Sequence, residues 1–364
     1  MIRAAHYRAG RGWDPQRPVL SERKGAVSRI EGSSETVVWN QGGGLYTTRY
    51  TQDYGWAVPV RIDRNAGTAS LLRLTSDGPD RSLAAWVVVN GRSHDVVVRE
   101  ENAGDWQPST VVDAGSGVVI GLDVAADRRG GVVVVWSRWE ETGYRVVVRR
   151  SAINGWEEAW RLDDGLGDAI EPHVAALPDG SAVVIWRQFD GSAYSLYATH
   201  YDPATGWGSP KPIESHHDDA VYPDLCGDGK GNALAVWLER RCIERRCVES
   251  NGRIARYDAG AEGWSRAVRL VPGASDIKTA CDATGRAIVI WVQNGAFGLP
   301  HIWSNRYDPV QGWGTPRPMK PDRRSSAHPA VAMNAQGAAV AVWEHFDLFS
   351  RRSLYGSWSA PQPN

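Results

Sequence analysis

Residues 172–210 read PHVAALPDGSAVVIWRQFDGSAYSLYATHYDPATGWGSP, and the pattern of this segment predicts the architecture of the chain. It contains four short pieces with strand composition, at residues 172–176, 180–186, 196–201 and 206–210. Gly, Asp and Pro turns separate the pieces from one another. Four short strands joined by tight turns predict one four-stranded antiparallel sheet.

Two series of Trp residues repeat this unit along the whole chain. The first series ends an apolar run and recurs every 47 to 54 residues, and the second follows a Gly in most copies. Seven copies of the unit predict an all-β, seven-bladed β-propeller, whose radial sheets leave only short protected edges. We expect both series to fill the wedges between blades. They account for 14 of the 18 Trp, namely Trp39, Trp86, Trp136, Trp186, Trp237, Trp291 and Trp343, and Trp13, Trp56, Trp106, Trp156, Trp207, Trp264 and Trp313.

The two ends of the chain predict how the ring closes. Residues 2–13 match residues 196–207, which form the second half of a unit. We therefore expect one domain over residues 1–364, in which residues 1–20 supply outer strands that complete the last blade and residues 321–364 form the C-terminal blade. Residues 354–361 also resemble a late strand, so the last blade is expected to draw strands from one or both ends.

Composition excludes several classes of partner. The chain has 41 basic and 42 acidic side chains and a net charge of −1, so no nucleic-acid partner is indicated. Its longest apolar run has seven residues, at positions 83–89, whereas a membrane-spanning helix needs about twenty. A Gly-rich phosphate loop, a Gly-x-Ser-x-Gly elbow and a His-Glu-x-x-His motif are all absent from the sequence, so no cofactor is predicted.

Three motifs carry a resemblance to a known group of proteins. They are Gly-Trp-Gly-Thr-Pro at 312–316, Gly-Ala-Ala-Val-Ala-Val-Trp at 337–343 and Asn-Arg-Tyr-Asp at 305–308. The pattern resembles that of bacterial exported β-propeller repeat proteins, most of them uncharacterised, and is loosely similar to sialidase-like and lectin-like propellers. The resemblance covers essentially the whole chain and implies the fold rather than an activity. The Ser-x-Asp-x-Gly-x-x-Trp box of sialidases is missing, as is a recognisable arginine clamp.

The cysteines indicate the cellular compartment in which the protein folds. All four lie between residues 226 and 281. Cys242 and Cys247 bracket an insertion of about five residues in the fifth unit, which a disulfide would staple. Cys226 and Cys281 fall on the innermost strands of neighbouring blades, so a second disulfide is an open alternative, and zinc is disfavoured because no Cys-x-x-Cys pair is present. Disulfides indicate an extracellular or periplasmic protein. Met1 leads directly into strand sequence, which we interpret as the start left after removal of a leader.

Side chains at one end of the innermost strands form the candidate site. Each unit has a reference position six residues before its first-series Trp, and this position is Gly in five of the seven units. The residues eight and six places before the reference position are mostly apolar, so we expect them to pack inside the blade. Because side chains alternate along a strand, the residues nine and seven places before it should face the channel. Nine places back lie Lys24, Leu71, Gly121, Glu171, Tyr222, Asp276 and His328, and seven places back lie Ala26, Arg73, Asp123, His173, Asp224, Lys278 and Ala330.

The channel-facing side chains differ from unit to unit, whereas the positions packed inside the blades stay mostly apolar. This difference predicts a polar pocket at the mouth of the channel. The alternative is a wet, polar channel without any activity. His216-His217-Asp218-Asp219 is interpreted as a solvated loop because adjacent residues point in different directions, and no metal site is predicted.

We therefore predict an exported, non-enzymatic binding module for a glycan or a cell-surface protein. Its predicted ligand contacts are Glu171, His173, Tyr222, Asp224, Asp276 and His328. The alternative is a polysaccharide hydrolase or lyase. In that case Tyr222 or His328 would be the general acid or base, and Lys278 or Arg73 would hold a substrate carboxylate. A third alternative is a structural or adhesion scaffold that uses the outer rim.

Overall fold

The structure is a computed structural model of the 364-residue chain. It describes residues 36–346 apart from 52, 64–66, 79, 128, 153–154, 215–217, 244–245, 296–297, 320–324 and 335–336, and towards the ends 3–4, 7–8, 12–13, 17–18, 27–32 and 352–359. The chain divides into two compact units, Met1–Arg161 and Leu162–Asn364. The described part is all-β, and it includes no helix with the length and hydropathy that crossing a bilayer requires.

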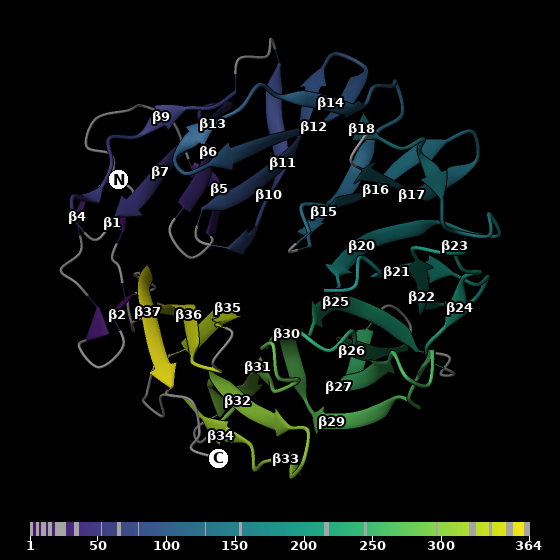
Figure 1. Ribbon diagram of the computed structural model, residues 1–364. Helices are drawn as coiled ribbons and strands as arrows, with labels where there is room; N and C mark the ends of the chain where they lie inside the picture. The colour runs from purple at the N-terminus through teal and green to yellow at the C-terminus, as the bar shows by residue number, and fades with distance from the viewer. Residues whose placement is uncertain are drawn as a thin grey trace. The chain divides into compact units, whose positions relative to one another are not determined.

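Unit 1 contains three five-stranded antiparallel sheets and a short N-terminal segment (Figure 1). The first sheet comprises β5 (Val27–Gly32), β6 (Thr36–Gln41), β7 (Gly44–Thr51), β8 (Gly55–Trp56) and β9 (Val60–Arg61). The second comprises β10 (Thr68–Gly78), β11 (Arg81–Asn90), β12 (Ser93–Asn102), β13 (Asp105–Trp106) and β14 (Thr110–Asp113). The third comprises β15 (Val119–Ala126), β16 (Val132–Glu140), β17 (Gly143–Ala152), β18 (Gly155–Trp156) and β19 (Trp160–Arg161).

Unit 2 repeats the same sheet three times and ends in a three-stranded sheet. Its first two sheets are β20 (Ala169–Ala176), β21 (Ala182–Phe189), β22 (Tyr194–Asp202), β23 (Gly206–Trp207) and β24 (Lys211–Pro212), then β25 (Asp219–Gly227), β26 (Ala233–Ile243), β27 (Arg246–Asp258), β28 (Gly263–Trp264) and β29 (Val268–Pro272). Next come β30 (Ala274–Cys281), β31 (Ala287–Asn294), β32 (Pro300–Asp308), β33 (Gly312–Trp313) and β34 (Arg317–Pro318), and finally β35 (Ser325–Met333), β36 (Ala339–Phe346) and β37 (Arg352–Ser359). The first strands of these four sheets lie in succession around the inside of the unit (Figure 1).

The predicted four-stranded unit is observed, with its fourth strand broken into two short pieces. In the sheet of β20–β24, Tyr201 pairs with Trp207 and Ala198 pairs with Lys211, so both pieces run along β22. The intervening Gly208 still donates its backbone N–H to the His200 carbonyl. The two pieces therefore form one interrupted outer strand rather than two separate strands of the sheet.

The N-terminal segment has the backbone register of a third and fourth strand, as its sequence match predicts. β2 (Tyr7–Arg8) pairs with β3 (Gly12–Trp13), and β1 (Arg3–Ala4) pairs with β4 (Arg17–Pro18). The third strand of the last sheet is β37, which comes from the C-terminal end and pairs with β36. That observation agrees with the late-strand character of residues 354–361. Closure of one seven-bladed ring by residues 1–20 stays a prediction.

Core packing explains why the first Trp series is periodic. Each hydrophobic cluster draws side chains from two consecutive sheets, and the cluster around Trp237, for example, also contains Ile185 and Leu196 of the preceding sheet. All seven first-series Trp are at most 2% exposed. Burying a ring system of this size between sheets accounts for much of the stability that each repeat gains from its neighbour.

The second Trp series is only partly core, so the prediction that all periodic Trp are core is wrong for these positions. Trp207, Trp264 and Trp313 are half-buried and pack against the Tyr that precedes them in the third strand, with ring centroids 5.1 to 5.7 Å apart. Trp264 and Trp313 also pack against the hydrophobic clusters as partly buried side chains, so this series lies at the margin of the core.

Candidate functional site

A β-bulge recurs at the start of the innermost strand in six of the described sheets. In β20 the register passes from Ile170 opposite Arg187 to His173 opposite Ile185, so Glu171 and Pro172 together oppose one residue. The same shift occurs in β10, β15, β25, β30 and β35. Bulges of this kind interrupt the ladder and change the direction of a side chain.

The bulge places the predicted mouth residues in an unusual backbone conformation. Leu71, Glu171, Tyr222, Asp276 and His328 have φ between 49° and 53°. Left-handed φ costs a non-glycine residue about 1–2 kcal/mol, yet the position carries an aromatic, a histidine and two carboxylates. Lys24 and Ala26, the corresponding residues of the first unit, lie outside the described residues.

The expected alternation of buried and more exposed side chains is observed along the innermost strands. Pro172, Pro223 and Ile277, eight places back, are buried, whereas Glu171, Tyr222, Asp276, His328 and His173 are half-buried or exposed. Tyr222 is 46% exposed. Burial therefore alternates from Glu171 to Val174, as the sequence predicts.

Seven of the eight predicted site residues belong to unit 2, and two of them form a direct pair. Lys278 Nζ lies 3.9 Å from Asp224 Oδ1, and Asp224 Oδ2 accepts a 2.7 Å hydrogen bond from the Thr279 backbone N–H. Asp224 therefore ties β25 to its neighbour β30. Arg73 is the exception and lies in unit 1, where it faces Asp123 of the next innermost strand at 3.6 Å.

Asp276 lies in the same electrostatic neighbourhood. Burial raises the pKa of its carboxyl above the ordinary value of 3.8, and the Asp224 charge raises it further. Lys278 and His328 lower this pKa again. His328 Nδ1 lies 3.1 Å from Glu344 Oε2, so a carboxylate orients an imidazole that is itself 69% exposed. Such an arrangement can bind polar ligand groups or exchange a proton with them.

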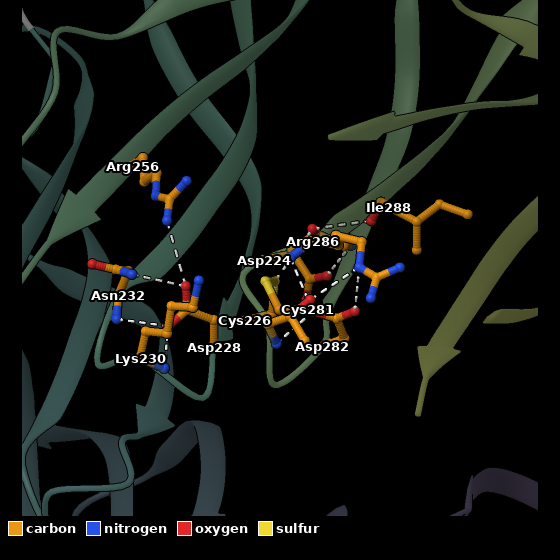
Figure 2. The surroundings of a disulfide bond; sticks show 12 residues. Asp224, Cys226, Asp228, Lys230, Asn232, Arg256, Cys281, Asp282, Arg286 and Ile288 are labelled. Atoms are coloured by element: carbon orange, nitrogen blue, oxygen red, sulfur yellow. Dashed lines mark hydrogen bonds and ion pairs between the residues drawn. A yellow bond between two sulfur atoms is a disulfide. The ribbon is translucent and has the colours of Figure 1, made fainter. Parts of the chain in front are cut away.

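A disulfide lies between the same two strands as Asp224 and Lys278. Cys226 of β25 is bonded to Cys281 of β30, and Figure 2 shows Asp224 beside this bond. Below it, Asp228 and Asp282 each accept backbone N–H bonds within their own tight turn (Figure 2). The covalent link therefore joins the two innermost strands next to the turns that follow them.

The disulfide that the sequence predicts between Cys242 and Cys247 would lie on the insertion of the fifth unit. Cys242 is disulfide-bonded, and its ladder partner across the hairpin of β26 and β27 is Cys247. The side chain of Cys247 is outside the described residues, as are His216 and His217 of the loop before β25.

Sequence reasoning missed the partners that the second and third strands supply. Arg187 Nη1 donates to Glu171 Oε1 at 2.9 Å, and its guanidinium lies over the Tyr194 ring at 4.7 Å. Arg240 lies over the Tyr222 ring at 4.8 Å. The signal was present, because positions one and three places after the first-series Trp also vary between units, as Arg187, Arg240 and Glu344 do.

Two of the off-period Trp are surface residues of unit 1. Trp139 is 43% exposed and meets Tyr144 edge to face, and Trp160 is 61% exposed. Trp303 in unit 2 is half-buried.

Comparisons with known proteins define the class of fold. No protein-family model matches the chain, nor does any curated protein sequence. Among solved structures, the chain is similar to the β-propeller domain of the Trilobed protease from Pyrococcus furiosus, with 11% identity, a TM-score of 0.55 and coverage of 94% of this chain and 99% of that one.

It is also similar to the polysaccharide lyase Uly1, with 10% identity, a TM-score of 0.59 and coverage of 90% and 88%. A protein of unknown function from Dyadobacter fermentans is 10% identical, with a TM-score of 0.50 and coverage of 80% and 94%. With the repeated antiparallel sheets described above, these likenesses show that the chain has a β-propeller fold.

Proposed function

We propose that the chain is an exported module that binds carbohydrate through the bulge residues of unit 2. The observation that carries the proposal is the left-handed conformation of Glu171, Tyr222, Asp276 and His328 at one position of four consecutive repeats. A strained backbone that persists under side chains of different chemistry is typical of binding and catalytic sites. Ligand contacts are assigned to Glu171, Tyr222, Asp276 and His328 together with the nearby side chains of His173 and Asp224.

The chemistry of these groups fits a sugar. An exposed Tyr ring offers a stacking face to the C–H groups of a pyranose, and carboxylates and imidazoles bind its hydroxyls. The likeness in fold to a protein described as a polysaccharide lyase agrees with this class of ligand. The Cys226–Cys281 disulfide and the bonded Cys242 suit an extracellular or periplasmic protein.

A glycan-array screen of the purified protein with two site variants tests the proposal. We expect selective binding that falls at least tenfold in Glu171→Ala and in Tyr222→Ala, because each loses a ligand contact. Glu262→Ala is a matched control, since Glu262 also has a left-handed φ of 47° but lies in the turn before β28. Binding that survives both site changes would place the ligand on the outer rim, and no binding to any glycan would favour a protein partner.

A polysaccharide hydrolase or lyase is the second candidate, and the His328–Glu344 pair favours it. An imidazole held 3.1 Å from a carboxylate is suited to general acid–base catalysis, and Tyr222 is a further candidate for that role. Incubation of a bound polysaccharide with the protein, followed by assays for new reducing ends and unsaturated products, distinguishes an enzyme from a lectin. Turnover lost in His328→Ala with binding retained would assign catalysis to this pair.

A further inference from the structure

Two neighbouring sheets of unit 2 each carry an arginine stacked on a tyrosine. Arg187 lies over Tyr194 in the sheet of β20–β24, and Arg240 lies over Tyr222 in the sheet of β25–β29. The two sheets are linked at this end, because the Tyr194 backbone N–H donates to Asp219 Oδ1 of β25 at 2.9 Å. The two stacks therefore belong to adjoining repeats of one unit.

The stacks differ in charge. Arg187 is ion-paired with Glu171 at 2.9 Å and is 11% exposed, so its charge is neutralised within the protein. Arg240 has no carboxylate partner among the described residues. Its ladder partner is Asp219, whose carboxylate accepts the Tyr194 N–H. Arg240 thus presents a positive charge beside a tyrosine ring that is 46% exposed.

The other cationic groups of the candidate site also have acidic partners. Lys278 faces Asp224 at 3.9 Å, and His328 faces Glu344 at 3.1 Å. Arg240, unlike Lys278 and His328, can therefore accept an anionic group without breaking an ion pair. Its planar guanidinium matches a carboxylate with two parallel hydrogen bonds.

We propose that Tyr222 and Arg240 form a subsite for the carboxylate-bearing ring of an acidic polysaccharide. The sugar ring stacks on the exposed part of the Tyr222 side chain, and its carboxylate meets the Arg240 guanidinium. The inference rests on the proposed carbohydrate function and adds to it a preference for uronic-acid residues.

The test compares polygalacturonate with the same polymer fully methyl-esterified, in affinity electrophoresis of the intact protein. We expect the wild type to bind the acidic form about tenfold more tightly, as one charge-assisted bidentate contact supplies. Arg240→Gln should abolish this preference by weakening binding of the acidic form, and Tyr222→Leu should weaken binding of both forms. Arg269→Gln is the matched control, because Arg269 is exposed on the outer strand β29 and its loss changes the net charge equally.

Equal affinity of the wild type for both polymers would overturn the acidic subsite and leave the carbohydrate function standing. The same loss of preference in Arg269→Gln as in Arg240→Gln would also overturn it, because the effect would then come from net charge. Failure to bind the acidic polymer, the ester or any glycan on the array would instead overturn the proposed function itself.

Discussion

Glu171, Tyr222, Asp276 and His328 share a backbone conformation that none of their side chains favours. Each has φ near 52°, where steric contact between Cβ and the following carbonyl disfavours every residue except glycine. The ladder on either side of the bulge holds this conformation, since hydrogen bonds resume within one or two residues on both strands.

The backbone strain can be measured at Asp276. Asp276→Gly should be more stable than Asp276→Ala by about 1 kcal/mol, because glycine adopts a positive φ without the Cβ clash. Urea unfolding of the two variants gives the difference, and both lose the same carboxylate. An alanine variant as stable as the glycine variant would mean that the bulge relaxes when the side chain is shortened.

Glu214 links two neighbouring sheets through hydrogen bonds to its carboxylate. Its carboxylate accepts the backbone N–H of Leu196 in β22 at 3.0 Å and the indole N–H of Trp237 in β26 at 3.1 Å. It therefore joins the third strand of one sheet to the buried Trp of the next. Burial raises the pKa of Glu214 from 4.5 to about 7, and the nearby Glu239 charge adds to the effect.

This pKa predicts how stability depends on pH. Between pH 4.5 and pH 7 the folded protein keeps a proton on Glu214 that the unfolded chain has lost, so the free energy of unfolding falls as pH rises. The loss is complete above pH 7 and amounts to roughly 3 kcal/mol. In thermal unfolding, the stability of the wild type should fall between pH 4.5 and pH 7, whereas that of Glu214→Gln should not show this pH dependence.

The Gln variant should also be less stable than the wild type at pH 4.5. Its amide nitrogen cannot accept a hydrogen bond, so one of the two N–H donors, Leu196 or Trp237, is left without an acceptor. A slope of equal size in the variant would assign the pH dependence to other groups.

For the whole molecule, the register of the N-terminal segment predicts how the last sheet is completed. The N-terminal segment pairs Tyr7 with Trp13 and Ala4 with Arg17, in the same register as Tyr201 with Trp207 and Ala198 with Lys211. We expect this segment to act as outer strands of the three-stranded sheet of β35–β37.

Deletion of residues 1–20 should therefore lower Tm by on the order of 5 °C, because an exposed sheet edge and its apolar face would lose their cover. A synthetic peptide of residues 1–20 should restore Tm when added in excess. An unchanged Tm after the deletion would show that these residues complete no sheet.

The repeated sheet, its strand order and the burial of the first Trp series could all be predicted from the sequence. They depend on local patterns, since the composition of each short strand and the turn between strands recur about every 50 residues. The face on which Glu171 and Tyr222 lie could be predicted as well, because alternation along a strand decides it.

Three features depend on the tertiary structure: the bulge, the half-burial of the second Trp series and the partners of the site residues. The left-handed φ of Tyr222 depends on a two-against-one register with β26, which strand composition does not encode. The stacking of Arg240 on Tyr222 and the pairing of Glu171 with Arg187 join residues 16 to 18 positions apart across a ladder. Local sequence determines which elements form, whereas contacts between side chains depend on register and on how neighbouring sheets pack.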